Sequence, residues 1–207
     1  GGVTPSPAQL ASVLHALSIP VHVLIRPRPG DFIYTAAEFA HMCRDIEHAH
    51  SAGAHGIASG VLLPGGRIDV PRTRALVELA RPMHFTFHRA FDETPDPFQA
   101  LEDVIRCGAD TLLTSGAAPE IISGSATIAR LREQAAQRLR IMAGGGLNIH
   151  NLADFVRRTG VSCLHGSFLR DSGILHSGPA RLQHRVREAA QLLRTAFAEA
   201  TEPQPVA

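Results

Sequence analysis

Apolar and polar positions divide the chain into short apolar runs and longer amphipathic stretches. A short, mostly apolar run is typical of a buried parallel strand, and apolar residues three and four apart are typical of a helix. The apolar runs predict six strands, at residues 21–26, 55–59, 83–88, 110–114, 140–143 and 161–165. The amphipathic stretches predict helices at 7–17, 35–51, 69–81, 96–107, 119–137, 148–159 and 179–200, with a break near Gly124 as an alternative for the fifth. Helix-capping residues precede four of them: Ser6, Thr35, Asp69 and Asn148.

Predicted strands and helices alternate without exception, which favours a parallel sheet with helical crossovers. An open doubly wound sheet and a TIM (β/α) barrel both have this pattern. The Gly-x-Gly-x-x-Gly turn of dinucleotide-binding sheets is missing after the first strand, whereas polar residues end nearly every strand, as at a barrel mouth. We therefore predict one TIM-barrel-like α/β domain over residues 1–200. It is open or incomplete, with six parallel strands of the usual eight, and is followed by a disordered tail at 201–207.

Titratable and glycine-rich residues gather at the predicted strand ends, where α/β proteins bind their ligands. The third strand shows this most clearly, because it runs directly into His88, Arg89 and Asp92. The other strand-end candidates are Arg26 and Arg28 after the first strand, Thr114, Ser115 and Gly116 after the fourth, Gly144, Gly145 and Gly146 after the fifth, and His165, Gly166 and Ser167 after the sixth.

Side-chain parity brings three of these candidates to one side of the sheet. Successive strand residues point to opposite faces, so Arg26, His88 and His165 would converge if their faces point into a barrel. One guanidinium and two imidazoles can hold an anion or transfer protons, and the imidazoles can also bind a metal ion. The alternative is that each histidine is a satisfied structural residue.

The glycine-rich turns at Gly144–Gly146 and Gly166–Ser167 are candidates for binding a phosphate. Barrel enzymes often hold phosphate between their last two strand-end loops, and glycines let backbone N–H groups approach an anion. The alternative is that the three glycines only form a tight turn.

Composition excludes several classes of function. A net charge of +1 gives no electrostatic case for binding nucleic acid or a membrane surface, and no apolar run reaches the roughly 20 residues that span a bilayer. Lysine is absent, which excludes a lysine Schiff base to a sugar or to pyridoxal phosphate. Three scattered cysteines, Cys43, Cys107 and Cys163, form neither a disulfide framework nor a zinc pattern and indicate a reducing compartment. No signal peptide is recognisable.

Six motifs, in order, resemble those of the CutC family of copper homeostasis proteins: IRPRPGDFIYTAAEF, GRIDVPRTRALVELA, TFHRAFDETPDP, LLTSG, IMAGGG and LHGS. The resemblance covers about residues 1–171. It implies a TIM barrel, a cytoplasmic location and a homo-oligomer, and it matches the six strands to the last six of the family's eight. The cysteine proposed to bind copper in the family lies in the part before Gly1, so that role has no counterpart among these residues.

Two classes of function remain open at this point. The resemblance implies a copper homeostasis protein with copper as its possible cofactor, for which Cys163 and His165 are the best-placed remaining ligands. The strand-end residues instead favour an enzyme acting on a small phosphorylated or carboxylated metabolite. In that case His88 or His165 would serve as acid or base, supported by Arg26, Arg89 and Asp92.

Overall fold

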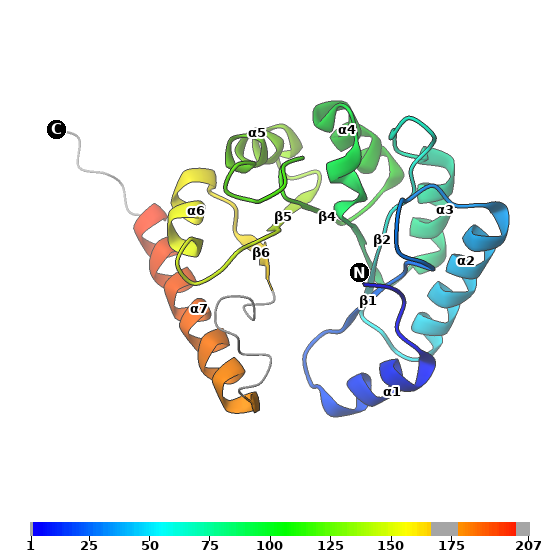
Figure 1. Cartoon of the computed structure of the whole chain (residues 1–207), viewed down its shortest axis with the longest axis horizontal. Coiled ribbons are helices and arrows are strands. Elements are labelled where there is room, and N and C mark those ends of the chain that lie inside the picture. Colours follow the sequence, from blue (N-terminus) through cyan, green and yellow to red (C-terminus); the bar gives the residue numbers. More distant parts are fainter. Residues whose placement is uncertain (1, 167–177, 202–207) are drawn as a thin grey trace. The chain divides into compact units, whose positions relative to one another are not determined.

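The computed structural model describes residues 2–166 and 178–201 (Figure 1). Strands and helices alternate through this part of the chain, as the apolar runs predict. The elements are α1 (Pro7–Ala16), β1 (His22–Leu24), α2 (Ala36–Ser51), β2 (Gly56–Ser59), α3 (Val70–Ala80), β3 (His84–Phe87), the 3-10 helix η1 (Arg89–Glu93), α4 (Pro97–Cys107), β4 (Thr111–Thr114), α5 (Ser125–Ala135), β5 (Arg140–Gly144), α6 (Leu152–Thr159), β6 (Cys163–His165) and α7 (Gly178–Thr201).

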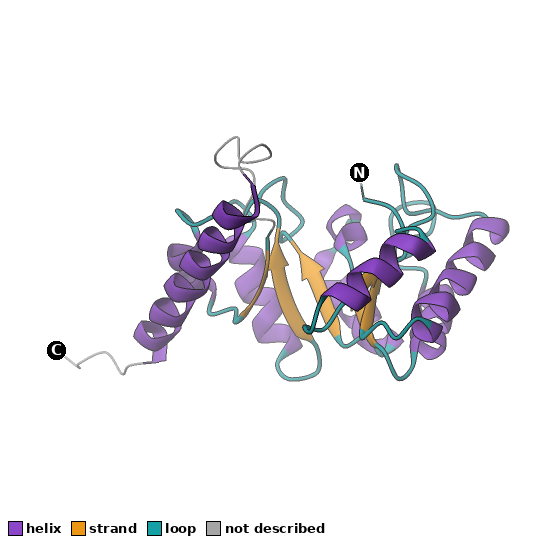
Figure 2. Ribbon diagram, turned by 90° about the horizontal axis from the view of Figure 1, so that it is seen from below, coloured by secondary structure: helices purple, strands orange, loops and turns teal. Residues whose placement is uncertain are grey.

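The strands form a six-stranded sheet in the order β1-β2-β3-β4-β5-β6. The pairings of β1 with β2, β2 with β3, β3 with β4 and β5 with β6 are all parallel. Helices border the strands (Figure 2). Parallel strands joined in chain order by helices are the repeat of a TIM barrel, so the predicted TIM-barrel-like fold with six strands is confirmed.

By its internal contacts the chain consists of two compact units, which are described separately. The first unit comprises Gly1–Leu113 with Ala135–Arg140, and the second comprises Thr114–Gln134 with Ile141–Ala207. The predicted tail at 202–207 lies outside the described residues, as does the segment 167–177.

Period-two alternation builds the core of the first unit. One face of its strands carries fully buried side chains, among them Ile25, Ile57, Phe85 and Phe87. Helices α2, α3 and α4 supply further buried apolar side chains, including Met42, Ile46, Leu76 and Leu101. On the other face the rings of His22 and His84 lie 5.3 Å apart, centroid to centroid. The two faces thus separate a helix-covered core from a polar side, as strand parity predicts.

Three of the four predicted helix caps are present. Ser6 and Thr35 each form a capping box with the residue three positions on, Gln9 and Glu38. The Asp69 side chain accepts a hydrogen bond from the Arg72 N–H at the start of α3. These local hydrogen bonds fix where each helix begins, so the sequence signal and the structure coincide.

The fourth predicted cap, Asn148, is wrong as a helix start, because α6 begins at Leu152. The Asn148 side chain instead accepts hydrogen bonds from the N–H groups of His150 and Asn151, at 2.9 and 3.1 Å. Asn148 therefore stabilises a turn that precedes α6, and it does not cap the helix itself.

The predicted start of the helix at residue 119 is also wrong, because residues 119–124 form bends and turns. The alternative of a break near Gly124 fits the structure, in which α5 starts at Ser125. The backbone of Gly124 packs directly against that of Ser115 and Gly116, which leaves no space for a Cβ atom. This close backbone contact holds Gly124 against the turn after β4, and the helix begins only after it.

Candidate functional site

The carboxyl ends of β1, β2 and β3 are held in register by hydrogen bonds that continue past the strands. The Ile25 N–H donates to the Ala58 carbonyl at 2.8 Å, and the His88 N–H donates to the Ser59 carbonyl at 2.9 Å. The fully buried Ser59 hydroxyl donates to the Ile25 carbonyl at 3.0 Å, which ties β2 to β1. His88 and Arg26 therefore extend from a rigid part of the sheet.

His88 is buried, and only one of its two ring nitrogens, Nδ1, makes a hydrogen bond within the described residues. Its Nδ1 accepts from the Ala90 N–H at 3.2 Å, which caps η1. A neutral imidazole whose Nδ1 accepts carries its proton on Nε2. That Nε2 is buried and makes no hydrogen bond, so His88 presents an unsatisfied donor.

Burial lowers the pKa of His88 from 6.5 to about 4, and the nearby Arg26 charge contributes to the lowering. A buried imidazolium would lose its hydration, so the neutral form is favoured. At neutral pH the ring is therefore a hydrogen bond donor without charge. The role of His88 as acid or base stays a prediction.

Gly60 creates the space in which the His88 ring lies. A Cβ atom at Gly60 would lie 2.8 Å from Nδ1 and 2.9 Å from Cε1 of His88, closer than side chains normally approach. Gly60 follows β2 directly, on the strand next to β3. The His88 imidazole thus fits in its position only because Gly60, just after the neighbouring strand, has no side chain.

Arg26 extends from the end of β1 and holds two segments of the first unit. Its Nη1 donates to the Gly2 carbonyl at 3.3 Å and its Nη2 to the Gly30 carbonyl at 2.6 Å. The guanidinium carbon lies 4.7 Å from the centre of the Phe32 ring, a cation–π contact. The remaining donor, Nε, is buried without a partner.

Phe32 and Tyr34, on the loop after β1, complete this cluster. The Phe32 ring lies 4.9 Å from the His88 ring, centroid to centroid, and so covers both His88 and Arg26. Tyr34 is buried, and burial raises its pKa although Arg26 acts against this shift. Arg26 is close enough to affect the Tyr34 hydroxyl electrostatically, but the geometry is not that of a hydrogen bond.

These five residues, Arg26, Phe32, Tyr34, Gly60 and His88, are called the β1–β3 mouth below. Three buried polar groups without partners, Arg26 Nε, Tyr34 Oη and His88 Nε2, lie in it. Buried polar groups are nearly always hydrogen-bonded in folded proteins. All three can donate, so the arrangement suits a ligand that accepts hydrogen bonds.

The other predicted cations near the β1–β3 mouth are already paired. Arg28 contacts two carboxylates, Glu38 at 2.6 Å and Asp31 at 2.9 Å. Arg89 contacts Asp92 at 2.7 Å within η1. The structure thus gives Arg28 a role in fixing the loop and places Arg89 and Asp92 in an ion pair beside His88 in the sequence.

The remaining predicted strand-end residues belong to the second unit, and several of them shape its loops. The buried Ser115 hydroxyl donates to the Ala118 carbonyl at 2.6 Å, and the Gly116 N–H donates to the Thr114 hydroxyl at 2.8 Å. These bonds close the turn after β4.

The triple-glycine turn has the backbone conformation that glycine permits. Gly145 and Gly146 have φ values of 125° and 93°, while Gly144 ends β5. The turn is held by side-chain and backbone hydrogen bonds, from Asn151 Nδ2 to the Gly146 carbonyl at 3.0 Å and from the Ile121 N–H to the Gly145 carbonyl at 2.9 Å. Whether it binds an anion stays a prediction.

Cys163 and His165 lie on β6 two residues apart, so they share one face of the strand, as predicted. His165 is exposed and Gly166 is half-buried, whereas Ser167 lies outside the described residues. Among the described residues no three His, Cys, Asp or Glu side chains gather closely enough to hold a metal ion. Burial raises the pKa of the Cys107 thiol to about 11 and also raises that of Cys43, which disfavours the thiolates that copper(I) prefers.

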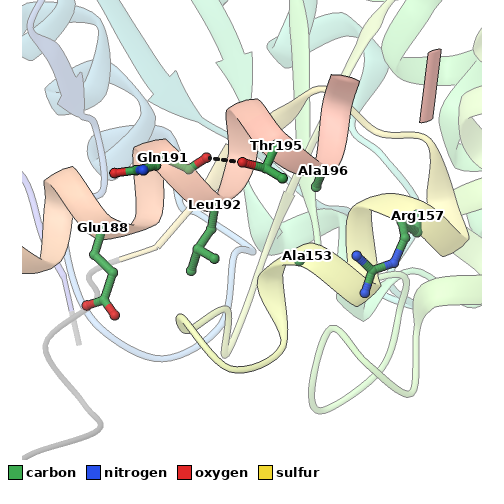
Figure 3. A pocket seen from close by; sticks show the side chains of 7 residues that line it. All are labelled: Ala153, Arg157, Glu188, Gln191, Leu192, Thr195 and Ala196. Atoms are coloured by element: carbon green, nitrogen blue, oxygen red, sulfur yellow. Dashed lines mark hydrogen bonds between the residues drawn. The ribbon is translucent and has the colours of Figure 1, made fainter. Parts of the chain in front are cut away.

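A cavity of about 330 Å³ lies elsewhere, between helices of the second unit (Figure 3). Ala153 and Arg157 of α6 form one wall, and five α7 residues form the other: Glu188, Gln191, Leu192, Thr195 and Ala196. None of the predicted site residues lines it. No described helix is both long and apolar enough to cross a membrane.

Sequence reasoning missed Phe32, Tyr34 and Gly60. The signal for the first two was weak but present, because Tyr34 is the only tyrosine and lies two residues from Phe32. Gly60 gives no such signal, because its effect on His88 appears only when β2 and β3 are placed side by side.

Sequence comparisons place this chain among proteins of one family. The model of the CutC family matches residues 1–170. A family protein CutC of Chromobacterium violaceum is 48% identical over 167 residues, covering 81% of this chain and 68% of that protein. A family protein CutC of Porphyromonas gingivalis is 42% identical over 171 residues, covering 83% of this chain and 69% of that protein.

Structural comparisons agree. The crystal structure of the putative copper homeostasis protein CutC from Streptococcus agalactiae superposes with a TM-score of 0.76 at 32% identity, covering 80% of this chain and 82% of that one. A mandelate oxidase structure with (S)-mandelic acid superposes with a TM-score of 0.65 at 12% identity, covering 96% of this chain and 73% of that one, a likeness of fold alone. On the family match, the identities and the fold, this chain belongs to the CutC family.

Proposed function

We propose that this protein binds a small anionic metabolite at the β1–β3 mouth. The observation that carries the proposal is the set of three buried donors without partners, on Arg26, Tyr34 and His88. An unsatisfied buried polar group costs about 1–3 kcal/mol. A ligand that accepts hydrogen bonds from these groups would recover that free energy on binding.

Neutral His88 gives the site a specific chemical role. With a pKa of about 4 it donates a hydrogen bond through Nε2 without carrying charge. A neutral imidazole of this kind can polarise a carbonyl or hold an oxyanion. The proposal therefore assigns His88 to orienting and polarising the ligand, and Arg26 to supplying the positive charge.

A titration tests this function. Calorimetry at pH 7.5 with a panel of small carboxylates and phosphates should detect binding of at least one anion to the wild-type protein. Arg26→Ala should weaken that binding by about 1.5–3 kcal/mol, the value of a hydrogen bond to a charged group. Circular dichroism must show that the variant is folded, because Arg26 also holds Gly2 and Gly30. If no anion on the panel binds, the proposed function is wrong.

Copper homeostasis is the second candidate function, and the name of the Streptococcus agalactiae relative, a putative copper homeostasis protein, favours it. Within this chain, the pair Cys163 and His165 on one face of β6 is the proposed copper site. Two ligands seldom make a tight, selective site, so this candidate predicts weak binding to the isolated chain. A cytoplasmic location and a homo-oligomeric state are part of the same proposal.

A further inference from the structure

The proposed anion site leaves two chemical classes of ligand, carboxylates and phosphates. Three features bear on the choice between them: the charges around the site, the backbone N–H groups that are already hydrogen-bonded, and the space beside Phe32. A choice between these classes rests on the proposed function, because both would bind at the same β1–β3 mouth.

The formal charges around the β1–β3 mouth cancel. Three guanidinium groups contact its residues: Arg26 lies over the Phe32 ring, Arg28 over the Tyr34 ring, and Arg72 donates to the Tyr34 carbonyl at 2.7 Å. Three carboxylates, those of Asp31, Glu38 and Asp69, pair with the last two. The Arg26 guanidinium donates its hydrogen bonds to backbone carbonyl groups and pairs with no carboxylate of the described residues, so it is the cation that a ligand would meet. One available positive charge matches a monoanion better than a phosphate dianion.

Four backbone N–H groups near His88 are already in use. Phosphate sites are usually built from several free N–H groups at a helix start or a glycine-rich turn. Here the N–H groups of His88, Ala90 and Phe91 donate to protein acceptors, as does that of Leu62 to the Phe32 carbonyl. The three donors without partners are side-chain groups, one each on Arg26, Tyr34 and His88. The two oxygens of one carboxylate have enough lone pairs to accept from all three.

Phe32 limits the size of the ligand. Its ring contacts both His88 and Arg26, and Phe32, Tyr34 and His88 are between 4% and 7% exposed. A ligand must displace this ring to reach the three donors. An aromatic wall beside the donors also suits a short carbon chain.

We infer that the β1–β3 mouth binds a short-chain monocarboxylate. Its oxygens accept hydrogen bonds from Arg26 Nε, Tyr34 Oη and His88 Nε2, and its carbon chain lies against Phe32.

Thermal unfolding and calorimetry at pH 7.5 test this inference with acetate and propionate as probes, against phosphate, sulfate and chloride at equal ionic strength. A ligand that binds only the folded state raises the unfolding midpoint. Sulfate and phosphate stabilise folded proteins non-specifically because they are excluded from the surface, so the variants below must identify site binding. We expect a saturable calorimetric signal with acetate and propionate and none with phosphate, sulfate or chloride.

Two conservative variants remove one donor each. Tyr34→Phe deletes the hydroxyl, and His88→Asn keeps an acceptor for the Ala90 N–H while it deletes the Nε2 donor. Each should lower the carboxylate affinity about tenfold or more, since a hydrogen bond to a charged group is involved. Because these donors have no partner in the free protein, neither loss should reduce the unfolding midpoint without ligand by the amount expected for a broken hydrogen bond.

Thr73→Val is the matched control. Thr73 on α3 also has a fully buried hydroxyl without a partner, outside the β1–β3 mouth, so its removal should leave carboxylate affinity unchanged. If phosphate or sulfate binds instead and Tyr34→Phe abolishes that binding, the anion site stands and its assignment to carboxylates is wrong. If no probe binds, or if both mouth variants bind acetate as wild type does, the inference and the proposed function both fail.

Discussion

His88 should make the protein sensitive to acid over a defined range of pH. The folded-state pKa is about 4 and the ordinary value is 6.5. Because the folded state disfavours the imidazolium, the contribution of His88 is fully present above pH 6.5 and is lost as the pH falls toward 4. At about 1.36 kcal/mol per pKa unit, the loss amounts to about 3 kcal/mol. This is a large part of the 5–15 kcal/mol that typically stabilises a folded protein.

Urea unfolding at pH 7.5, 5.5 and 4.0 would measure this loss for wild type and for His88→Asn. The free energy of unfolding should fall less steeply for the variant, with a difference of about 3 kcal/mol accumulated between pH 7.5 and 4.0. Some slope should remain in both proteins, because burial also lowers the pKa of His22 and His84. His150→Asn removes an exposed imidazole and serves as the control.

Parallel pH profiles for wild type and His88→Asn would refute the reasoning, since the buried imidazole would then titrate alike in both states. Saturating acetate offers a second check. A bound carboxylate beside His88 favours the imidazolium, so the acid-induced loss should become smaller in wild type and stay unchanged in the variant.

Three further predictions concern Gly60, the copper pair and the sheet edges. Gly60→Ala should displace the His88 ring and lower anion affinity in calorimetry at least tenfold, and wild-type affinity would show that the ring does not need this space. Titration with copper(I) against a competing chelator should show only weak binding, and tight one-to-one binding abolished by Cys163→Ala would contradict this. Because β1 and β6 end the strand order and edge strands invite pairing, sedimentation should show association, whereas a stable monodisperse monomer would count against it.

The sequence predicted the order and type of the main elements because each carries a local signal. Strands such as His84–Phe87 lie inside short apolar runs, and Ser6 and Thr35 form capping boxes with residues three positions away. The wrong predictions concern segments whose conformation depends on contacts with residues that are distant in the sequence. Gly124 lies against Ser115 and Gly116, so the segment before it turns instead of forming a helix. The 3-10 helix after β3 was missed because the side chain of His88, a predicted site residue, caps it.

Strand parity, a local signal, accounts for two residues of the proposed site. Parity along β1 and β3 placed Arg26 and His88 on one side, and the Phe32 ring indeed contacts both. The protonation state of His88 could not be predicted, because it depends on burial beneath a loop residue and on the absence of a side chain at Gly60. Strand periodicity gives the direction of a side chain, whereas its pKa depends on neighbours that are distant in the sequence.

Residues 2–4 have a consequence for the proposed site. The Thr4 N–H donates to the Arg26 carbonyl and the Thr4 hydroxyl accepts from the Arg26 N–H, both at 2.9 Å, while the Gly2 carbonyl binds the guanidinium. The segment before α1 therefore holds both the backbone and the guanidinium of Arg26 in place. A substitution at Gly2 or Thr4 should thus disturb Arg26, and with it the proposed ligand site, through these hydrogen bonds.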